Sequence, residues 1–257
     1  MSDNVPRVSR RKLITRGLTA VAGVSGLGVA AKIADQYGLI PPDWGGVWGP
    51  GETLTYASQR ILMSVHSMAP EFNRSEISKV APVNGKAPQT DLYEGMRHAG
   101  FAEWRLAVDG LVARPSSFSL AELKSFPSRS QITHQACEEG WSFIAEWAGV
   151  PLSYLLNHVG INDRAKFVVF FTFDERWWGS LDLPDSFHPQ TFLAYGMNGE
   201  DLPADHGAPL RVRVARQLGY KSIKYLTRIT VTDALKNIGD GRGSSAPSHG
   251  FSWYAGI

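Results

Sequence analysis

The sequence of 257 residues contains a single cysteine, Cys137. One thiol excludes an internal disulfide framework and any metal cluster that several cysteines would hold. Charge is also modest, because 19% of the residues are charged and the net charge is +2. Nucleic-acid binding requires clustered positive charge against phosphates, so this balance argues against a nucleic-acid partner.

The signatures of several common enzyme classes are also missing. The chain has no phosphate-binding loop of the Gly-x-x-x-x-Gly-Lys-Ser/Thr type and no Gly-x-Gly-x-x-Gly motif after a strand. It likewise lacks a His-Glu-x-x-His zinc motif and a Gly-x-Ser-x-Gly nucleophile elbow. The remaining candidates for a functional site are Cys137 and the glycine-rich turns that contain basic residues.

The positive charge is concentrated at the N-terminus. Residues 1–34 contain six Lys and Arg residues and one acid, whereas the rest of the chain has a net charge of −3. The pair Arg10-Arg11 precedes the uncharged, mildly apolar stretch 17–31, which is the layout of a twin-arginine export signal. A basic tail followed by an amphipathic helix is the alternative. We expect a periplasmic protein whose leader is either cleaved or retained as an anchor.

The remaining pattern predicts a mixture of short strands and helices. A capping box at Ser119 and Glu122 opens one helix, and Pro151 opens a second that ends at Gly160. Strands are predicted at 104–110, 166–172, 211–215 and 223–232. The predicted strands and helices do not alternate regularly as in successive βαβ units, which favours an α+β fold.

Three parts of the chain are expected from this pattern. Residues 1–34 form the leader or anchor, 35–84 an irregular linker with an N-terminal extension, and 85–257 a single catalytic domain. Within these parts, the stretch 35–52 is rich in glycine and proline and is expected to be irregular. Residues 239–248 are expected to be a flexible loop.

Three segments could carry chemistry. Cys137 lies among polar residues and tryptophans and could be a soft metal ligand, a nucleophile or a small buried apolar residue. Glycine and proline bend the chain in the turns 206–211 and 219–224, so His206, Arg211 and Lys224 could face one target and form a cradle for an anion. Each turn could equally be a solvated surface feature.

Four segments then occur in an order and at spacings typical of one family. They are Gln-Ala-Cys-Glu-Glu-Gly-Trp at 135–141, Tyr-Gly-Met-Asn-Gly-Glu at 195–200, His-Gly-Ala-Pro-Leu-Arg at 206–211 and Gly-Tyr-Lys-Ser-Ile-Lys at 219–224. In these segments the chain resembles the sulfite oxidase family of molybdopterin enzymes. It is most similar to the exported branch that contains the catalytic subunit of periplasmic protein-methionine-sulfoxide reductase. The likeness covers roughly residues 85–235.

The resemblance implies a molybdenum–molybdopterin cofactor with one pterin and no nucleotide. It assigns Cys137 as the thiolate ligand of molybdenum. Its implied pterin contacts are Tyr93, Glu94, Thr172, His206, Arg211, Ser222, Ile223 and Lys224. His134 could donate a hydrogen bond to a substrate oxygen or be a structural histidine, and five tryptophans could line the approach: Trp141, Trp147, Trp177, Trp178 and Trp253.

Two departures from the family bear on the substrate. Sulfite oxidases follow their cysteine with arginine-rich sequence, whereas Glu138-Glu139-Gly140-Trp141 stands here and would repel sulfite. The reductase branch usually has asparagine at the place of His206. We therefore expect an oxotransferase acting on a sulfur oxide or related oxo substrate, such as methionine sulfoxide, with a membrane haem protein or a cytochrome as redox partner. A sulfite dehydrogenase feeding a cytochrome and a non-catalytic periplasmic binding module are the alternatives.

Overall fold

The computed structural model describes residues 29, 32, 34, 39–42, 49–63, 66–174 and 176–257. The arginine pair and nearly all of the predicted leader lie outside these residues, as do residues 43–48 of the predicted linker. In the described part of the chain, no helix combines the length and the apolar character needed to cross a membrane.

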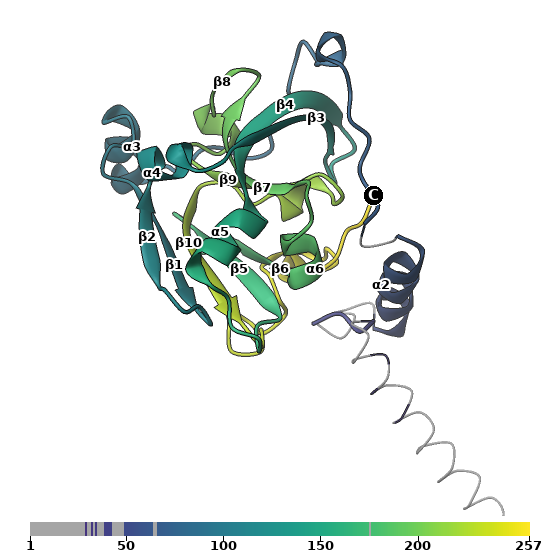
Figure 1. Ribbon diagram of the computed structural model, residues 1–257. Coiled ribbons are helices and arrows are strands. Elements are labelled where there is room, and N and C mark those ends of the chain that lie inside the picture. The colour runs from purple at the N-terminus through teal and green to yellow at the C-terminus, as the bar shows by residue number, and fades with distance from the viewer. Residues whose placement is uncertain are drawn as a thin grey trace, which may run out of the picture.

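Two five-stranded sheets form the body of the protein (Figure 1). The first has the order β2 (Ser116–Ser119), β1 (Arg105–Gly110), β10 (Leu226–Thr232), β5 (Phe167–Thr172) and β6 (Trp178–Asp182). The second has the order β3 (Arg129–Ala136), β4 (Ser142–Pro151), β7 (Thr191–Met197) and β8 (Glu200–Asp201), with β9 (Arg211–Val214) also paired to β7. Only β1 and β10 pair in parallel; the other strand pairs that the structure describes are antiparallel.

Short helices connect and flank the sheets. In the described part of the chain, the α-helices with given bounds are α2 (Pro50–Leu62), α3 (Asp91–His98), α4 (Leu120–Ser125), α5 (Leu152–Val159) and α6 (Leu183–Ser186). The single-turn 3₁₀ helices described there are η2 (Arg74–Glu76), η3 (Ala204–His206), η4 (Gly219–Lys221) and η5 (Ala246–His249). Mixed sheets with flanking helices confirm the predicted α+β class.

Local sequence signals explain several of these elements. Ser119 and Glu122 form the predicted capping box at the start of α4. Helix α5 begins after Pro151, and Gly160 closes it in the left-handed conformation at φ 70°. The strand predicted from 223 starts only at Leu226, because the preceding residues turn around the cavity described below.

The main core lies between the two sheets. Strands of both sheets contribute to it, including Val168 and Ile229 from the first and Leu193 and Val212 from the second. Helix α5 adds four fully buried residues, Leu152, Leu155, Leu156 and Val159. Burying a side chain of this kind stabilises the fold by about 1.5–3 kcal/mol relative to leaving it exposed.

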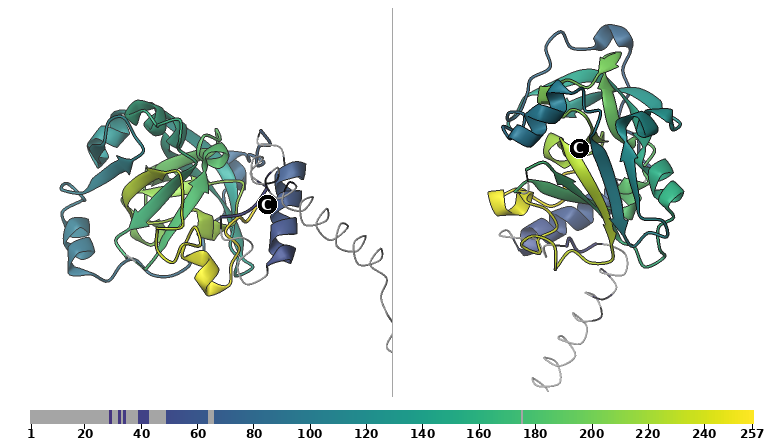
Figure 2. Two further views of the ribbon diagram at one scale, coloured as in Figure 1. Left: turned by 90° about the horizontal axis from the view of Figure 1, so that it is seen from below. Right: turned by 90° about the vertical axis from the view of Figure 1, so that its left-hand side faces the viewer.

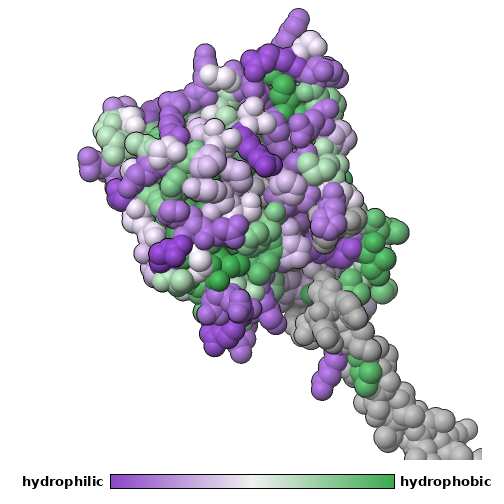
Figure 3. Space-filling view, viewed as in Figure 1, coloured by the Kyte–Doolittle hydropathy of each residue, from purple (hydrophilic) through white to green (hydrophobic). Residues whose placement is uncertain are grey.

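Within 35–52, residues 39–42 and Gly49 are irregular as expected, whereas Pro50 begins helix α2. It lies beside the C-terminal segment (Figures 1 and 2), where the Tyr56 ring contacts Trp253 and Tyr254 with centroids 6.0 and 5.4 Å apart. The opposite face of α2 is apolar and exposed, as the green patch at the right of Figure 3 shows. Leu54, Ile61 and Leu62 form that face.

The segment 239–248 is a loop as expected until it enters η5, but it is packed against the protein rather than flexible. Residues 243–247 are buried. A Cβ on Gly239 would lie 2.3 Å from Trp178, and one on Gly243 would lie 2.6 Å from Trp253. The glycines therefore reflect close backbone packing against two tryptophans rather than chain flexibility.

Candidate active site

A cavity of about 460 Å³ lies where β3 and β5 end and β9 begins. It brings together six of the predicted site residues from distant parts of the chain: Cys137, Thr172, His206, Arg211, Ser222 and Lys224. The two turns predicted as an anion cradle therefore share one cavity with the thiol.

Cys137 follows β3, in the short connection to β4. Its N–H donates to the carbonyl of Trp141 at 2.9 Å, and Gly140 closes the turn at φ 91° by donating to the Cys137 carbonyl. Cys137 is buried, with 7% of the residue exposed. Burial is the main cause that raises its pKa, and the nearby Glu138 carboxylate adds to the effect. The backbone N–H of Glu139 opposes it by hydrogen bonding.

Asn84 is a neighbour of the thiol that the sequence did not reveal. Its side-chain Nδ2 donates to Cys137 Sγ at 3.5 Å and to Glu138 Oε1 at 3.3 Å. The backbone carbonyl of Asn84 accepts from Lys224 Nζ at 2.7 Å. One segment of the N-terminal extension is thus tied both to the thiol and to the basic turn.

Arg211 is anchored in the cavity wall by backbone groups of both turns. Its Nη1 donates to the His206 carbonyl at 2.7 Å, and its Nη2 donates to the Ser222 carbonyl at 2.9 Å. Complete burial lowers the pKa of Arg211 to about 10. The same burial, together with the charges of Arg211 and Lys224, lowers the pKa of His206 to about 4, so its imidazole is neutral at pH 7.

The two basic turns are in direct contact. Lys224 Nζ donates to the Asp205 carbonyl at 2.9 Å, next to His206. Gly207, at φ 112°, leaves no room for a Cβ, which would lie 2.9 Å from Lys224 Cβ. Burial and the charge of Arg211 lower the pKa of Lys224 to about 8. The environment of this lysine favours loss of its proton in the absence of an anion.

A second buried arginine, Arg213, lies behind Arg211 on β9. Its Nη2 donates to the His134 carbonyl at 2.7 Å and to Thr133 Oγ1 at 3.2 Å. Burial, then the charge of Arg211, lowers its pKa to about 9. Charged residues that alternate along a strand normally form a solvent-exposed face, so the sequence did not predict that Arg213 is buried.

No carboxylate in the described residues forms an ion pair with Arg211, Arg213 or Lys224. Buried charges are ordinarily paired, because an isolated charge is expensive to remove from water. This excess of positive charge therefore favours an anionic ligand at the end of the cavity that Arg211 and Lys224 line.

The other predicted pterin contacts occupy different positions. Thr172 Oγ1 donates to the carbonyls of Asp174 and Trp177 at 2.8 and 3.0 Å, so it shapes the turn after β5. Ile223 is part of the main core and presents its carbonyl to Val212 N–H at 2.9 Å. Ile223 therefore positions the basic turn through its backbone and its apolar side chain.

Tyr93 and Glu94 are not among the residues that line the cavity. Tyr93 is completely buried and donates its hydroxyl to the Ala208 carbonyl at 3.0 Å, which supports the turn before Arg211. Glu94 pairs with Arg97 within α3 at 2.6 Å.

His134 also lies away from the cavity. Side chains alternate along β3, and Thr133 and Gln135 are buried on the face opposite to His134. Gln135 lines the cavity, whereas the His134 ring packs near Phe72, with centroids 6.5 Å apart. This placement does not support a hydrogen bond from His134 to a substrate at Cys137.

The tryptophans divide into two groups. Trp141 and Trp177 line the cavity, whereas Trp147, Trp178 and Trp253 are buried in packing contacts. The cavity wall also contains aromatic residues that the sequence did not single out, namely Tyr220, Tyr225 and Phe251.

The residues present fit an anionic, metal-bearing cofactor. Among the described side chains, Arg211 Nε and Gln135 Oε1 are buried without a hydrogen-bond partner, and both residues line the cavity. The Cys137 thiol offers a soft ligand for a transition metal. No group of three or more His, Cys, Asp and Glu side chains that could hold a metal occurs within the described ranges.

Comparisons with known proteins agree with this chemistry. The family described as an oxidoreductase molybdopterin binding domain matches residues 93–237. A putative protein-methionine-sulfoxide reductase subunit, YedZ1 of Azospira oryzae, is 33% identical over 198 residues, which cover 77% of this chain and 71% of that protein.

A solved structure also matches part of the chain. The crystal structure of the sulfane dehydrogenase SoxCD from Paracoccus pantotrophus aligns with a TM-score of 0.49 and 26% identity. The alignment covers 51% of this chain and 39% of that one, so this chain spans well under half of its length. From the domain match and the curated relative, this chain belongs to the sulfite oxidase-like family of oxidoreductases that contain a molybdopterin-binding domain.

Proposed function

We propose that this oxidoreductase is an exported, molybdenum-dependent oxotransferase that reduces a sulfoxide, with methionine sulfoxide as the leading candidate. The observation that carries the proposal is the shared cavity of a buried thiol, Cys137, and two buried or half-buried cations, Arg211 and Lys224, that have no carboxylate partner among the described residues. The name of the Azospira relative supports the substrate class.

Each wall of the cavity would hold a different part of the cofactor. Cys137 would provide a thiolate to molybdenum, which suits soft sulfur ligands. Arg211 and Lys224 would hold the phosphate of the pterin, since a guanidinium fork and an ammonium are both strong phosphate donors. When bound, the cofactor supplies two-electron oxygen-atom transfer, while the protein provides binding, orientation and electrostatics.

The remaining residues of the wall control access. Glu138 and Glu139 follow the thiol directly and oppose the approach of an anion such as sulfite. Trp141 and Trp177 make the approach partly apolar, which favours a neutral sulfoxide and limits water. Neutral His206 and the Arg211–Ser222 contact keep the basic turns in place.

Export and the electron donor are further parts of the proposal. The twin-arginine pattern at Arg10-Arg11 suits a protein that folds around its cofactor before it leaves the cytoplasm. Sulfoxide reduction consumes two electrons, and a single cysteine cannot attach a c-type haem through a Cys-x-x-Cys-His motif. We therefore assign the supply of electrons to a separate haem protein of the membrane.

The test is purification from an exporting bacterial host, followed by measurement of molybdenum and pterin. We expect one molybdenum and one pterin per chain, and reduction of methionine sulfoxide by a reduced viologen dye. Oxidation of sulfite with no reduction of any sulfoxide would replace this proposal by a sulfite dehydrogenase. A folded protein that retains neither molybdenum nor pterin would instead indicate a binding module.

A further inference from the structure

Gln135 lies beside the thiol, on the side of the β3–β4 hairpin that faces the cavity. It precedes Cys137 by two residues, and both residues line the cavity. Their neighbours across the hairpin, Phe143 and Trp141, line it as well. Side chains two residues apart on a strand share a face, and their Cα atoms are about 6.5 Å apart. The Gln135 amide is therefore close to any molecule that binds next to the thiol.

The side chain of Gln135 is a buried amide that forms no hydrogen bond with the described residues. Only 7% of the residue is exposed. Its Oε1 has no exposed surface, whereas Nε2 is not among the atoms that are enclosed in this way. Buried polar groups are nearly always hydrogen-bonded, and an exception often has a functional role. The amide nitrogen is thus the polar end of Gln135 that a ligand in the cavity can reach.

Gly219 leaves this nitrogen uncovered. A Cβ at position 219 would lie 3.2 Å from Gln135 Nε2 and 3.2 Å from the Ala136 carbonyl oxygen. Gly219 is not one of the glycines with a positive φ, so its backbone conformation does not require glycine. The close approach of η4 to the end of β3 does require it. A side chain at this position would cover the Gln135 amide.

Two other hydrogen-bond donors of the cavity wall are already engaged. Asn84 Nδ2 donates to the Cys137 sulfur, and Trp141 Nε1 donates to Glu139 Oε2 at 2.8 Å. His134, the donor expected from the sequence, lies on the opposite face of β3. The Gln135 amide is therefore a donor near the thiol that is available to a bound molecule.

The charge around Gln135 favours a neutral acceptor. Glu138 and Glu139 line the same cavity and oppose an anion, and the amide itself carries no charge. The oxygen of a sulfoxide is neutral and accepts hydrogen bonds strongly. An amide donor therefore suits a sulfoxide oxygen better than it suits a sulfite dianion, for which a guanidinium fork is the stronger partner.

We propose that Gln135 is the residue that binds the substrate oxygen, with Nε2 as the donor and the sulfoxide oxygen as the acceptor. The inference rests on the proposed sulfoxide reduction and adds the group that recognises the S–O bond. Gln135 thus takes the role expected for His134, because alternation along β3 turns the neighbouring side chain into the cavity.

Gln135→Met in the full-length holoenzyme tests the proposal, since methionine has a similar length but no donor. We expect KM for dimethyl sulfoxide to rise about tenfold, the size of one hydrogen bond, while kcat changes less than about twofold. A contact present in both the bound substrate and the transition state affects KM in this way. An unchanged KM would overturn the assignment.

Gln131→Met is the matched control. Gln131 is buried on the same face of β3 but lies outside the cavity, and its Nε2 donates to the Gln190 carbonyl at 3.2 Å. We expect this variant to keep KM and to lose stability in chemical denaturation. Gln135→Met should lose none, because it removes a buried amide that is not paired within the fold. A loss of stability as large as that of Gln131→Met would make Gln135 a structural residue instead.

A binding measurement separates this inference from the proposed function. Dimethyl sulfone has acceptor oxygens, and calorimetric titration measures its affinity without turnover. We expect Gln135→Met to bind it about tenfold more weakly than the unsubstituted protein does. That result with no reduction of any sulfoxide would refute the reaction and keep Gln135 as the residue that binds the oxygen. Sulfoxide reduction with equal sulfone affinities would refute the role of Gln135 alone.

The molybdenum and pterin contents of both variants complete the test. We expect Gln135→Met and Gln131→Met to retain equal amounts, because the assigned partner of Gln135 is the substrate. Loss of the cofactor from Gln135→Met alone would make Gln135 a cofactor contact and contradict the proposal.

Discussion

The side-chain amide of Asn84 donates to Cys137 Sγ at 3.5 Å, although 53 residues separate the two in the sequence. A hydrogen bond to a thiolate withdraws electron density from the sulfur and so tunes the metal that the sulfur binds. Lys224 holds the Asn84 backbone from the other side of the cavity. The segment around Asn84 thus links the thiol to the basic turn at Lys224.

Replacing Asn84 should change the metal–thiolate bond without removing it. In Asn84→Ala we expect the sulfur-to-molybdenum charge-transfer band to move to lower energy, because the sulfur electrons are no longer stabilised by the donor. Activity should fall about tenfold, as for other outer partners of metal ligands. Visible absorption of the purified holoprotein provides the measurement. Asn157→Ala, an exposed change on α5, is the matched control, and an unshifted band in Asn84→Ala would contradict the assigned contact.

Cys137→Ser should abolish turnover while preserving the fold. A serine hydroxyl is a hard, weakly acidic group and is a poor substitute for a thiolate at molybdenum. We expect at least a hundredfold loss of sulfoxide reduction and a change of about 1 kcal/mol in the free energy of unfolding. Metal analysis and chemical denaturation measure the two effects. Full activity of this variant would remove the cysteine from the mechanism.

His206 should make the cofactor-free protein sensitive to acid. Its pKa is lowered to about 4 by burial, then by the charges of Arg211 and Lys224, whereas an unfolded histidine titrates near 6.5. Between these values the unfolded chain binds more protons, so the free energy of unfolding falls as the pH decreases from about 6.5 towards 4.

The variant His206→Asn should flatten this dependence, because asparagine does not titrate. The reductase branch that this chain resembles usually has asparagine at this place, so we expect cofactor retention to persist. Denaturant titrations at several pH values between 4 and 7 provide the test, with the exposed His98→Asn as control. An unchanged pH slope in His206→Asn would show that other groups cause the acid sensitivity.

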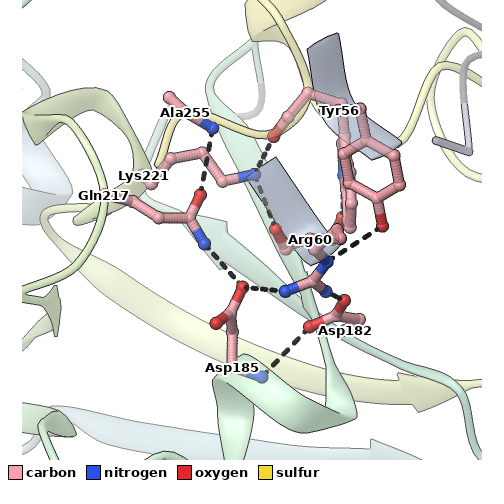
Figure 4. Close-up of polar contacts among 9 residues, drawn as sticks. Tyr56, Arg60, Asp182, Asp185, Gln217, Lys221 and Ala255 are labelled. Carbon is pink, nitrogen blue, oxygen red and sulfur yellow. Dashed lines mark hydrogen bonds and ion pairs between the residues drawn. The ribbon is translucent and has the colours of Figure 1, made fainter. Parts of the chain in front are cut away.

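Arg60 should anchor α2 to the body of the protein. It pairs with Asp182 and Asp185, and Asp185 also accepts from Gln217 Nε2 at 2.8 Å (Figure 4). Arg60→Leu leaves two largely buried carboxylates without their partner, so we expect α2 docking to weaken by about 3 kcal/mol. Hydrogen exchange should then accelerate in 50–62 and 250–256.

The exposed pair of Arg105 and Glu122 supplies the control for this change. Its side chains are about half exposed, and pairs of this kind contribute less than about 1 kcal/mol. Arg105→Leu should therefore leave hydrogen exchange in α2 unchanged. Equal effects of the two substitutions would mean that the Arg60 pair does not hold the helix.

Much of the fold followed from local signals. The capping box at Ser119, the apolar face of α5 and the apolar run of β5 each specify an element through neighbouring residues alone. Cys137, His206, Arg211 and Lys224 were identified from motifs whose turns depend on local glycine and proline. The resemblance implied that these four residues share one cavity, and the structure shows that they line the same cavity.

The errors share a different origin. Gly239 and Gly243 predicted a flexible loop. The structure instead leaves no room for a side chain at either position, because Trp178 and Trp253, which are distant in sequence, pack against them. His134 was selected for its spacing from Cys137. Its side chain, however, lies on the face of β3 opposite to the buried residues Thr133 and Gln135, and so away from the cavity. A single sequence does not show which residues from distant parts of the chain will cover a given residue in the folded protein.

Local sequence signals established the α+β class, a candidate thiol ligand and the two basic turns, because short-range backbone preferences and side-chain chemistry set these properties. Only the packing of distant segments shows that Asn84 contacts the thiol, that Arg213 is buried behind Arg211, and that α2 docks on the C-terminal segment. Those features arise from long-range packing, where burial and charge depend on segments far apart in the chain.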